Sequence, residues 1–480
     1  MLTNNCILCH DAKCTRACGR FEPDRLLRSL FFDNRNVVRN ELADGIPCAA
    51  CDAPCEKVCP VGVNIKDLIL DAGKDAPEKR KPLSYDSLKT DFCGVPMENP
   101  FMLSSSAVSA NYDMVAYAFD QGWGGVSYKT VCLMDINEAS PRYSAIKGNG
   151  NRIIGFKNIE QLSDHEFIEN IETFKRIKKD FPTKFLMVSV MGRDEEEWAY
   201  LARMLDKSGI DALELNFSCP NMTEEHTGSD VGQIPELVEK YCRVVRANTS
   251  LPFIAKLTPN ITHIEESADA AIRGGADGVA AINTIKSLIE VDIDPSDGIF
   301  NASIGGYSGR AVKPIALRFI TELSQDKNLA GKHISAMGGI ETWRDALEYI
   351  VLGADTLQVT TAVMQYGTRI ITDLKDGLAL YLEDHGYKSI KELDGVTVEG
   401  IVPTSELDRS YIIYPKFDRT KCVGCGRCHI SCMDGGHQAI EMKNDRPVMN
   451  ASKCVGCHLC ILVCPMGAIS SSEKKVSKKK

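Results

Sequence analysis

The chain has 480 residues, of which 44% are apolar and 25% charged, the balance of a globular protein with room for two or three domains. Acidic residues outnumber basic ones by 65 − 56 = 9, which argues against a nucleic-acid-binding surface. No run of about 18 uncharged apolar residues occurs, so no membrane span is expected. The first residues contain no apolar signal-peptide core, so we expect a cytoplasmic protein.

In a reducing compartment the 20 cysteines are not expected to form disulfides, which favours metal binding or catalysis. Sixteen of them fall into four tight groups, two near each end of the chain. We predict a cysteine-rich N-terminal region at 1–85, a globular body at 86–400, a cysteine-rich module at 412–470 and a disordered basic tail at 471–480.

The two C-terminal groups share the spacing Cys-x2-Cys-x2-Cys-x3-Cys. Three thiolates from one loop can hold three corners of a 4Fe-4S cubane, while the fourth cysteine, at the start of a helix, turns to the partner cluster. Structural zinc is the alternative, but it prefers two Cys-x2-Cys knuckles separated by a longer loop. The spacing predicts a ferredoxin-like module with one cluster on Cys422, Cys425, Cys428 and Cys464, and the other on Cys454, Cys457, Cys460 and Cys432.

The two N-terminal groups are spaced less regularly. Their eight thiolates suffice for two more cubanes, by ligation within each group or across the groups, and zinc fits better here than at the C-terminus. A segment with apolar residues at helical spacing joins the groups and can pack them together. The candidate ligands are Cys6, Cys9, Cys14, Cys18, Cys48, Cys51, Cys55 and Cys59.

The body alternates short apolar runs with helical stretches, the pattern of a parallel sheet in an α/β protein. Eight such units predict a (β/α)8 TIM barrel, whose chemistry lies at the C-terminal ends of its strands. The strands are expected near residues 100–104, 125–129, 185–191, 212–217, 253–257, 278–282, 334–336 and 356–359.

Two adjacent glycines, Gly338 and Gly339, and two adjacent threonines, Thr360 and Thr361, follow the last two predicted strands. The loops after strands seven and eight are the usual phosphate site of this fold, and such residues offer backbone and hydroxyl donors. Iron–sulfur clusters carry single electrons, whereas a flavin exchanges one or two. FMN is therefore the expected phosphate-bearing cofactor.

Three further residues at predicted strand ends carry reactive or charged groups. Lys129 and Lys256 are expected to place positive charge near the flavin and to favour its reduced form. Cys219 follows a strand and stands apart from the cysteine groups, which makes it a candidate proton donor or acceptor. The other isolated cysteines are interpreted as buried core residues: Cys93, Cys132 and Cys242.

The body resembles the FMN barrel of the dihydroorotate dehydrogenase superfamily and, within it, the dihydropyrimidine dehydrogenases, in stretches such as NPFMLSSS, GFKNIE, LNFSCP, AKLTPN and AMGGI. The resemblance implies flavin-dependent reduction of the 5,6 double bond of uracil or thymine, with Cys219 as the general acid. It implies substrate-binding roles for Asn158, Glu160, Asn216, Ser218, Asn283 and Thr284. It implies FMN-binding roles for Ser105, Lys129, Lys256, Gly306, Gly338, Gly339, Thr360 and Thr361.

The N-terminal region has no GxGxxG fingerprint after a strand, so a flavoprotein NAD(P)H reductase subunit or a ferredoxin is expected to deliver electrons to an oligomeric enzyme. The loop PNMTEEHTGSDVGQ after Cys219 departs from the family's glycine-rich stretch. Because this loop would cover the substrate, the sequence does not fix which ring the enzyme reduces. One alternative is a dihydroorotate dehydrogenase, disfavoured because Glu160 would face the carboxylate of orotate. The other is a non-catalytic electron-transfer subunit whose barrel only holds FMN.

Overall fold

The computed structural model describes residues 6–46, 48–148, 152–224, 226–289, 291 and 303–478. Residues 1–400 form one compact unit, and residues 401–480 form a second. Among the helices of the described residues, none has the length and apolar character needed to cross a bilayer.

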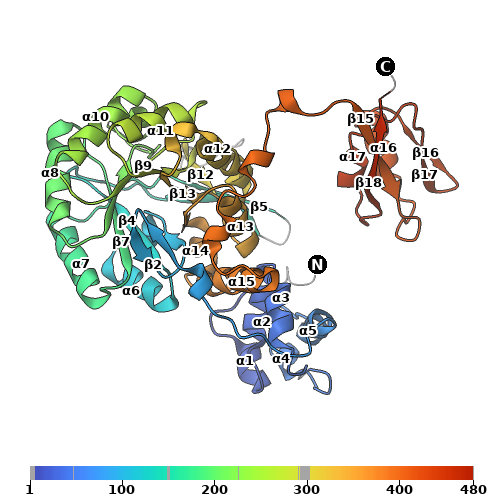
Figure 1. The fold of residues 1–480 in the computed structure, drawn as a ribbon. Coiled ribbons are helices and arrows are strands. Elements are labelled where there is room, and N and C mark those ends of the chain that lie inside the picture. The colour runs from blue at the N-terminus through green and yellow to red at the C-terminus, as the bar shows by residue number, and fades with distance from the viewer. Residues whose placement is uncertain are drawn as a thin grey trace. The chain divides into compact units, whose positions relative to one another are not determined.

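Eight parallel strands in the body close into a barrel, which confirms the predicted TIM barrel (Figure 1). The order around it is β10-β13-β14-β3-β4-β7-β8-β9. These strands are buried on both faces, which is why they are mostly apolar in the sequence. Their bounds are β3 (Phe101–Leu103), β4 (Gly125–Val131), β7 (Phe185–Val190), β8 (Ala212–Asn216), β9 (Phe253–Lys256), β10 (Gly278–Ala281), β13 (His333–Met337) and β14 (Thr356–Val359).

The helices between these strands have recognisable start signals. Helix α8 begins after Asp194, whose side chain accepts a hydrogen bond from the Glu197 backbone N–H, and α13 begins with a capping box of Thr342 and Asp345. The helices of the body are α6 (Tyr112–Gln121), α7 (Phe167–Asp180), α8 (Glu195–Asp206), α9 (Ser229–Gly232), α10 (Pro235–Arg246), α11 (Ile264–Arg273), α12 (Lys313–Gln325), α13 (Trp343–Val351), α14 (Thr361–Tyr366) and α15 (Ile370–His385).

Two small antiparallel sheets accompany the barrel and are absent from the sequence-based prediction. Strands β1 (Thr90–Phe92) and β2 (Val95–Met97) form a hairpin whose Phe92 and Met97 pack with apolar side chains of the barrel strands. A four-stranded sheet combines β5 (Tyr143–Lys147), β6 (Ile153–Asn158), β11 (Ile285–Ser287) and β12 (Gly305–Ser308). These strands are short and partly exposed, so they lack the apolar runs that mark the barrel.

The N-terminal region folds into short helices that pack on α15, and it shares one compact unit with the barrel (Figure 1). The contact is polar and buried: Asp373 of α15 accepts from Arg28 Nε over 2.6 Å and from Ser29 Oγ over 2.8 Å. The helices are α1 (Lys13–Cys18), α2 (Pro23–Phe31), α3 (Arg35–Glu41), α4 (Pro54–Lys57) and α5 (Ile65–Gly73).

The second unit contains two antiparallel strand pairs and two helices. Its long strand β18 (Ile469–Ser477) pairs with β15 (Tyr411–Phe417), so the prediction of disorder from residue 471 is wrong for residues 471–477. Composition is polar here, but pairing with β15 satisfies the backbone, and Lys475 lies 4.2 Å from the Tyr411 ring. Residues 479 and 480 lie outside the described residues. The other elements are β16 (Ile440–Lys443), β17 (Arg446–Met449), α16 (Arg427–Gly435) and α17 (Leu459–Leu462).

Candidate active site

A cavity of about 1120 Å³, open to solvent, lies at the C-terminal ends of the barrel strands. Active sites of TIM barrels lie at this end of the strands. It is lined by most of the predicted site residues: Ser105, Lys129, Asn158, Glu160, Asn216, Cys219, Lys256, Asn283, Thr284, Gly338, Gly339, Thr360 and Thr361.

Two predicted ligand-binding residues, Gly306 and Ser218, lie behind the cavity wall. A Cβ on Gly306 would stand 2.1 Å from Thr284 Oγ1, so glycine is needed for β12 to approach, and the Gly306 carbonyl accepts from Asn158 Nδ2 over 3.2 Å. Ser218 is fully buried, and its hydroxyl accepts from Asn283 Nδ2 over 2.9 Å. Both residues support lining side chains, and their direct contact with a ligand stays a prediction.

Glycines and hydroxyls gather at one end of the cavity. Gly338 and Gly339 have φ of +130° and +71°, and a Cβ on Gly339 would lie 2.9 Å from the Gly309 carbonyl oxygen. Close by, Thr361 Oγ1 lies 2.9 Å from Ser308 Oγ. A cradle without side chains lets backbone N–H groups approach a phosphate closely. The end formed by these residues therefore fits the phosphate of a nucleotide-like cofactor.

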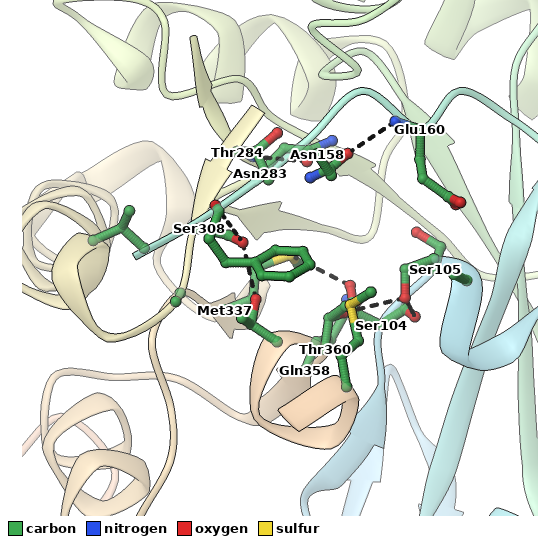
Figure 2. A pocket seen from close by; sticks show the side chains of 18 of the residues that line it. Ser104, Ser105, Asn158, Glu160, Asn283, Thr284, Ser308, Met337, Gln358 and Thr360 are labelled. Atoms are coloured by element: carbon green, nitrogen blue, oxygen red, sulfur yellow. Dashed lines mark hydrogen bonds between the residues drawn. The ribbon is translucent and has the colours of Figure 1, made fainter. Parts of the chain in front are cut away.

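Amide side chains gather at another part of the same cavity, where Figure 2 shows Asn158, Asn283 and Thr284 close together. Asn221, which the sequence analysis did not single out, holds this group in place. Its Nδ2 donates to the Glu160 carbonyl oxygen over 2.9 Å and lies 3.3 Å from Asn158 Oδ1. Amides can pair with alternating donors and acceptors of a ring without introducing charge.

Cys219 lies directly after β8 and is 7% exposed. The Asn221 backbone N–H donates to its sulfur, but burial dominates and raises the pKa of Cys219 to about 11. The nearby carboxylate of Glu138 acts in the same direction as burial. The group is therefore a protonated thiol at neutral pH, as a general acid requires.

The cavity lysine Lys129 is paired with carboxylates. Its Nζ lies 3.0 Å from Glu160 Oε2 and 3.6 Å from Glu138 Oε1. Arg142 NH1 lies 2.8 Å from the other oxygen of Glu160. The charge of Lys129 is therefore compensated by buried carboxylates, and its predicted contact with the flavin stays a prediction. Glu138 and Arg142 come from a loop without periodicity, so no sequence signal marks them.

Lys256, the second lysine, is paired with Glu214 of β8. Its Nζ lies 3.2 Å from Glu214 Oε2, and Glu214 also accepts from Ser105 Oγ over 2.7 Å and from Gln358 Nε2 over 2.8 Å. Burial by itself would raise the pKa of Glu214, but the Lys256 charge and these donors hold the pKa below its ordinary value. Glu214 precedes Asn216 by two residues on the same strand face, a signal that the sequence analysis overlooked.

The C-terminal cysteines surround two cavities in the crossed arrangement that their spacing predicts. One, of about 400 Å³, is lined by Cys422, Cys425, Cys428 and Cys464. The other, of about 370 Å³, is lined by Cys432, Cys454, Cys457 and Cys460. Backbone N–H groups point at the crossing sulfurs, with Ala439 N 3.3 Å from Cys432 Sγ and Ala468 N 3.3 Å from Cys464 Sγ.

The N-terminal cysteines, whose pairing the sequence leaves open, are also crossed. A cavity of about 520 Å³ is lined by Cys6, Cys9, Cys14 and Cys59. The remaining four lie together: burial, and then the proximity of Cys55, Cys51 and Cys18, raises the pKa of Cys48 to about 11. Among the described residues, no three His, Cys, Asp or Glu side chains converge tightly enough for one metal ion.

Comparison with known families agrees with this geometry. Residues 87–382, more than half of the chain, match the family model described as dihydroorotate dehydrogenase. The chain belongs to the dihydroorotate dehydrogenase family. Residues 416–471 match the 4Fe-4S dicluster domain, which confirms the predicted ferredoxin-like module.

Among relatives of this family member is the NAD-dependent dihydropyrimidine dehydrogenase subunit PreA of Escherichia coli K12, which is 53% identical over 358 residues, covering 74% of this chain and 87% of PreA. The chloroplastic dihydropyrimidine dehydrogenase (NADP(+)) of Arabidopsis thaliana is 36% identical, with 68% of this chain and 80% of that protein covered. The catalytic subunit of dihydroorotate dehydrogenase B (NAD(+)) of Pyrococcus abyssi is 37% identical, and the match covers 65% of this chain and 99% of that protein.

A solved structure of dihydroorotate dehydrogenase from Eimeria tenella, in complex with ferulenol, superposes with a TM-score of 0.55. Its sequence is 18% identical, and the match covers 65% of this chain and 88% of that one. At this identity the likeness concerns the barrel fold alone.

Proposed function

We propose that the protein reduces the 5,6 double bond of a pyrimidine base, uracil or thymine, with FMN in the barrel and electrons supplied through 4Fe-4S clusters. The observation that carries this proposal is one cavity that combines a protonated thiol, a set of neutral amides and a glycine-lined phosphate cradle. Relatives named as dihydropyrimidine dehydrogenases, one of them 53% identical, support the substrate class.

The residues present fit FMN. The side-chain-free cradle of Gly338 and Gly339, with Thr360 and Thr361, would hold the phosphate. Ser105, Lys129 and Lys256 on the cavity wall would bind the ring system. When bound, FMN supplies hydride to carbon 6 of the base and exchanges single electrons for pairs.

The chain's own residues would orient the base and supply the proton. Asn158, Asn283 and Thr284 would pair with its carbonyl and imide groups, and Asn216, whose Nδ2 donates to Thr130 Oγ1, lies beside them on the cavity wall. Cys219 would donate its proton to carbon 5 and take one up again afterwards. Cys219 belongs to a buried apolar cluster with Cys132, Leu162 and Met191, which limits water around the thiol.

Four clusters would form the electron path, two at the C-terminal sites and two in the N-terminal region. The chain carries no dinucleotide fingerprint, so we propose that a flavoprotein NAD(P)H reductase subunit or a ferredoxin delivers the electrons. The relative PreA is named as a subunit, which implies a partner subunit and supports such an assembly.

An assay with uracil, thymine and orotate tests the proposal. With an electron donor present, dihydrouracil should accumulate from uracil, whereas orotate should leave the reduced flavin unoxidised. Turnover of orotate alone would favour a dihydroorotate dehydrogenase. Glu160 does not decide between the two substrates, because Lys129 and Arg142 compensate its charge. If none of these compounds reoxidises the reduced flavin, a non-catalytic electron-transfer subunit would be favoured.

A further inference from the structure

A polar column crosses the barrel interior beneath the candidate active site, where TIM barrels usually carry layers of Val, Ile and Leu. Glu214 is its uppermost member and accepts from Gln358 Nε2 over 2.8 Å. The same nitrogen donates to Ser335 Oγ over 3.1 Å, and Thr356 Oγ1 donates to Ser335 Oγ over 3.0 Å. His333 Nε2 lies 2.9 Å from Thr356 Oγ1 at the far end, and all five residues are buried.

This column is not a proton path. Gln358 donates through its amide nitrogen both upward to Glu214 and downward to Ser335, and an amide N–H₂ group has donors but no acceptor site. A relay is therefore interrupted at Gln358. The column holds the carboxylate of Glu214 in place. The property of Glu214 that can affect the active site is therefore its negative charge.

That charge faces the cavity lysine Lys256. Glu214 Oε2 lies 3.2 Å from Lys256 Nζ, and both side chains are almost completely buried, at 0% and 3% exposure. Within the part of the chain that the structure describes, the other hydrogen-bond partners of Lys256 are the neutral hydroxyls of Ser104 and Ser105. In a weakly screened interior, opposite charges at this distance cancel much of each other's field, and removal of one leaves the other uncompensated.

We propose that Glu214 is a positioning residue that compensates the charge of Lys256 and thereby keeps the reduction potential of bound FMN low. The inference rests on the proposed function, in which Lys256 contacts FMN. A full positive charge beside the ring would stabilise the reduced, negatively charged flavin, whereas a compensated lysine donates its hydrogen bond with a weaker field. Glu214 itself does not line the cavity.

The first test compares the midpoint potential of FMN in the wild-type holoenzyme and in Glu214→Gln, which removes the charge and keeps the shape. We expect a positive shift, together with about tenfold tighter binding of sulfite, which adds to oxidised flavin as an anion. Ser127→Ala is the matched control, because Ser127 Oγ touches the same carboxylate oxygen at 3.3 Å and carries no charge. Its potential should match the wild type. An unchanged or lower potential in Glu214→Gln, with FMN bound, would overturn the proposal.

The second test uses the FMN-free protein, so it remains informative if the proposed function fails. Glu214→Gln should lower the unfolding temperature because Lys256 stays charged and buried, and Glu214→Gln with Lys256→Met should recover part of the loss. If Glu214→Gln does not fold but Glu214→Gln with Lys256→Met does, that result also supports charge compensation. A double variant no more stable than Glu214→Gln contradicts the compensation. A wild-type protein that binds no FMN contradicts the proposed function instead.

Discussion

The backbone N–H of Cys219 donates to Asn216 Oδ1 over 3.1 Å, and Asn216 Nδ2 in turn donates to Thr130 Oγ1 over 2.9 Å. Ser218 donates to the same Asn216 oxygen through both its backbone and its hydroxyl. The turn that presents the thiol is therefore tied to β4, which lies two strands away from β8 around the barrel. The position of the thiol therefore depends on side chains of the barrel strands as well as on the loop that follows it, whose Ser229 N–H donates to the Cys219 carbonyl oxygen over 2.9 Å.

Cys219→Ser should reduce pyrimidine turnover about 10²- to 10⁴-fold, since a hydroxyl is a weaker acid than the thiol. FMN content and reduction of the flavin by the electron donor should stay normal, because the variant removes only the proton donor. Cys132→Ser is the control: Cys132 packs in the same apolar cluster but does not line the cavity. Normal turnover in Cys219→Ser would remove this residue from the mechanism.

Alkylation of Cys219 should remain slow at neutral pH and rise toward pH 11, because its pKa is raised from 9.0 to about 11. Peptide-resolved mass spectrometry of iodoacetamide-treated protein measures this rate. The folded thiol holds its proton to higher pH than the unfolded one, so its contribution to stability is complete below pH 9 and declines as the pH rises through 11. A half-maximal rate near pH 8 would contradict the assignment.

Asn221→Ala should raise the KM for the base roughly tenfold with a smaller change in kcat, because the hydrogen bonds that hold Glu160 and Asn158 are lost. Gln233→Ala serves as the control. Gln233 donates to the Ser229 carbonyl oxygen further along the same segment and does not line the cavity. Equal KM effects in both variants would indicate general loosening of the segment.

Asp373→Ala should destabilise the first unit by about 3–5 kcal/mol, because it leaves the guanidinium of Arg28 without its buried partner. Asp384→Ala should cost less than about 1 kcal/mol, since its ion pair with Lys81 is partly exposed. Urea unfolding of both variants measures the difference. Similar losses would mean that the N-terminal region is not anchored by this buried pair.

Cys59→Ser should disturb the cluster site of Cys6, Cys9 and Cys14, because these residues share a cavity with Cys59. We expect the wild type to bind about sixteen iron atoms in four cubanes and the variant to bind fewer. Differential alkylation identifies the exposed ligands. Loss of protection at Cys48, Cys51 and Cys55 instead would show ligation within each group.

Much of the architecture was predictable from the sequence for physical reasons. A strand buried on both faces is apolar over most of its length, so all eight barrel strands were found. The antiparallel sheet that contains β6 was not, because its strands are short and partly exposed. Residues 471–477 were wrongly predicted to be disordered, since pairing with β15 is a long-range contact that composition does not reveal.

The sequence alone established which chemical groups the protein holds: the C-terminal cluster spacing, the thiol of Cys219 and the glycines and amides after the strands are local patterns. Only the tertiary structure decided how their charges balance. Lys256 meets Glu214 across 42 positions because β8 and β9 pair in parallel, and Lys129 meets Glu160 across 31 because Glu160 follows β6 of the small antiparallel sheet. Spacing likewise could not pair the N-terminal cysteines, since crossing depends on how α1 and α4 pack, and packing is not a local property of the chain.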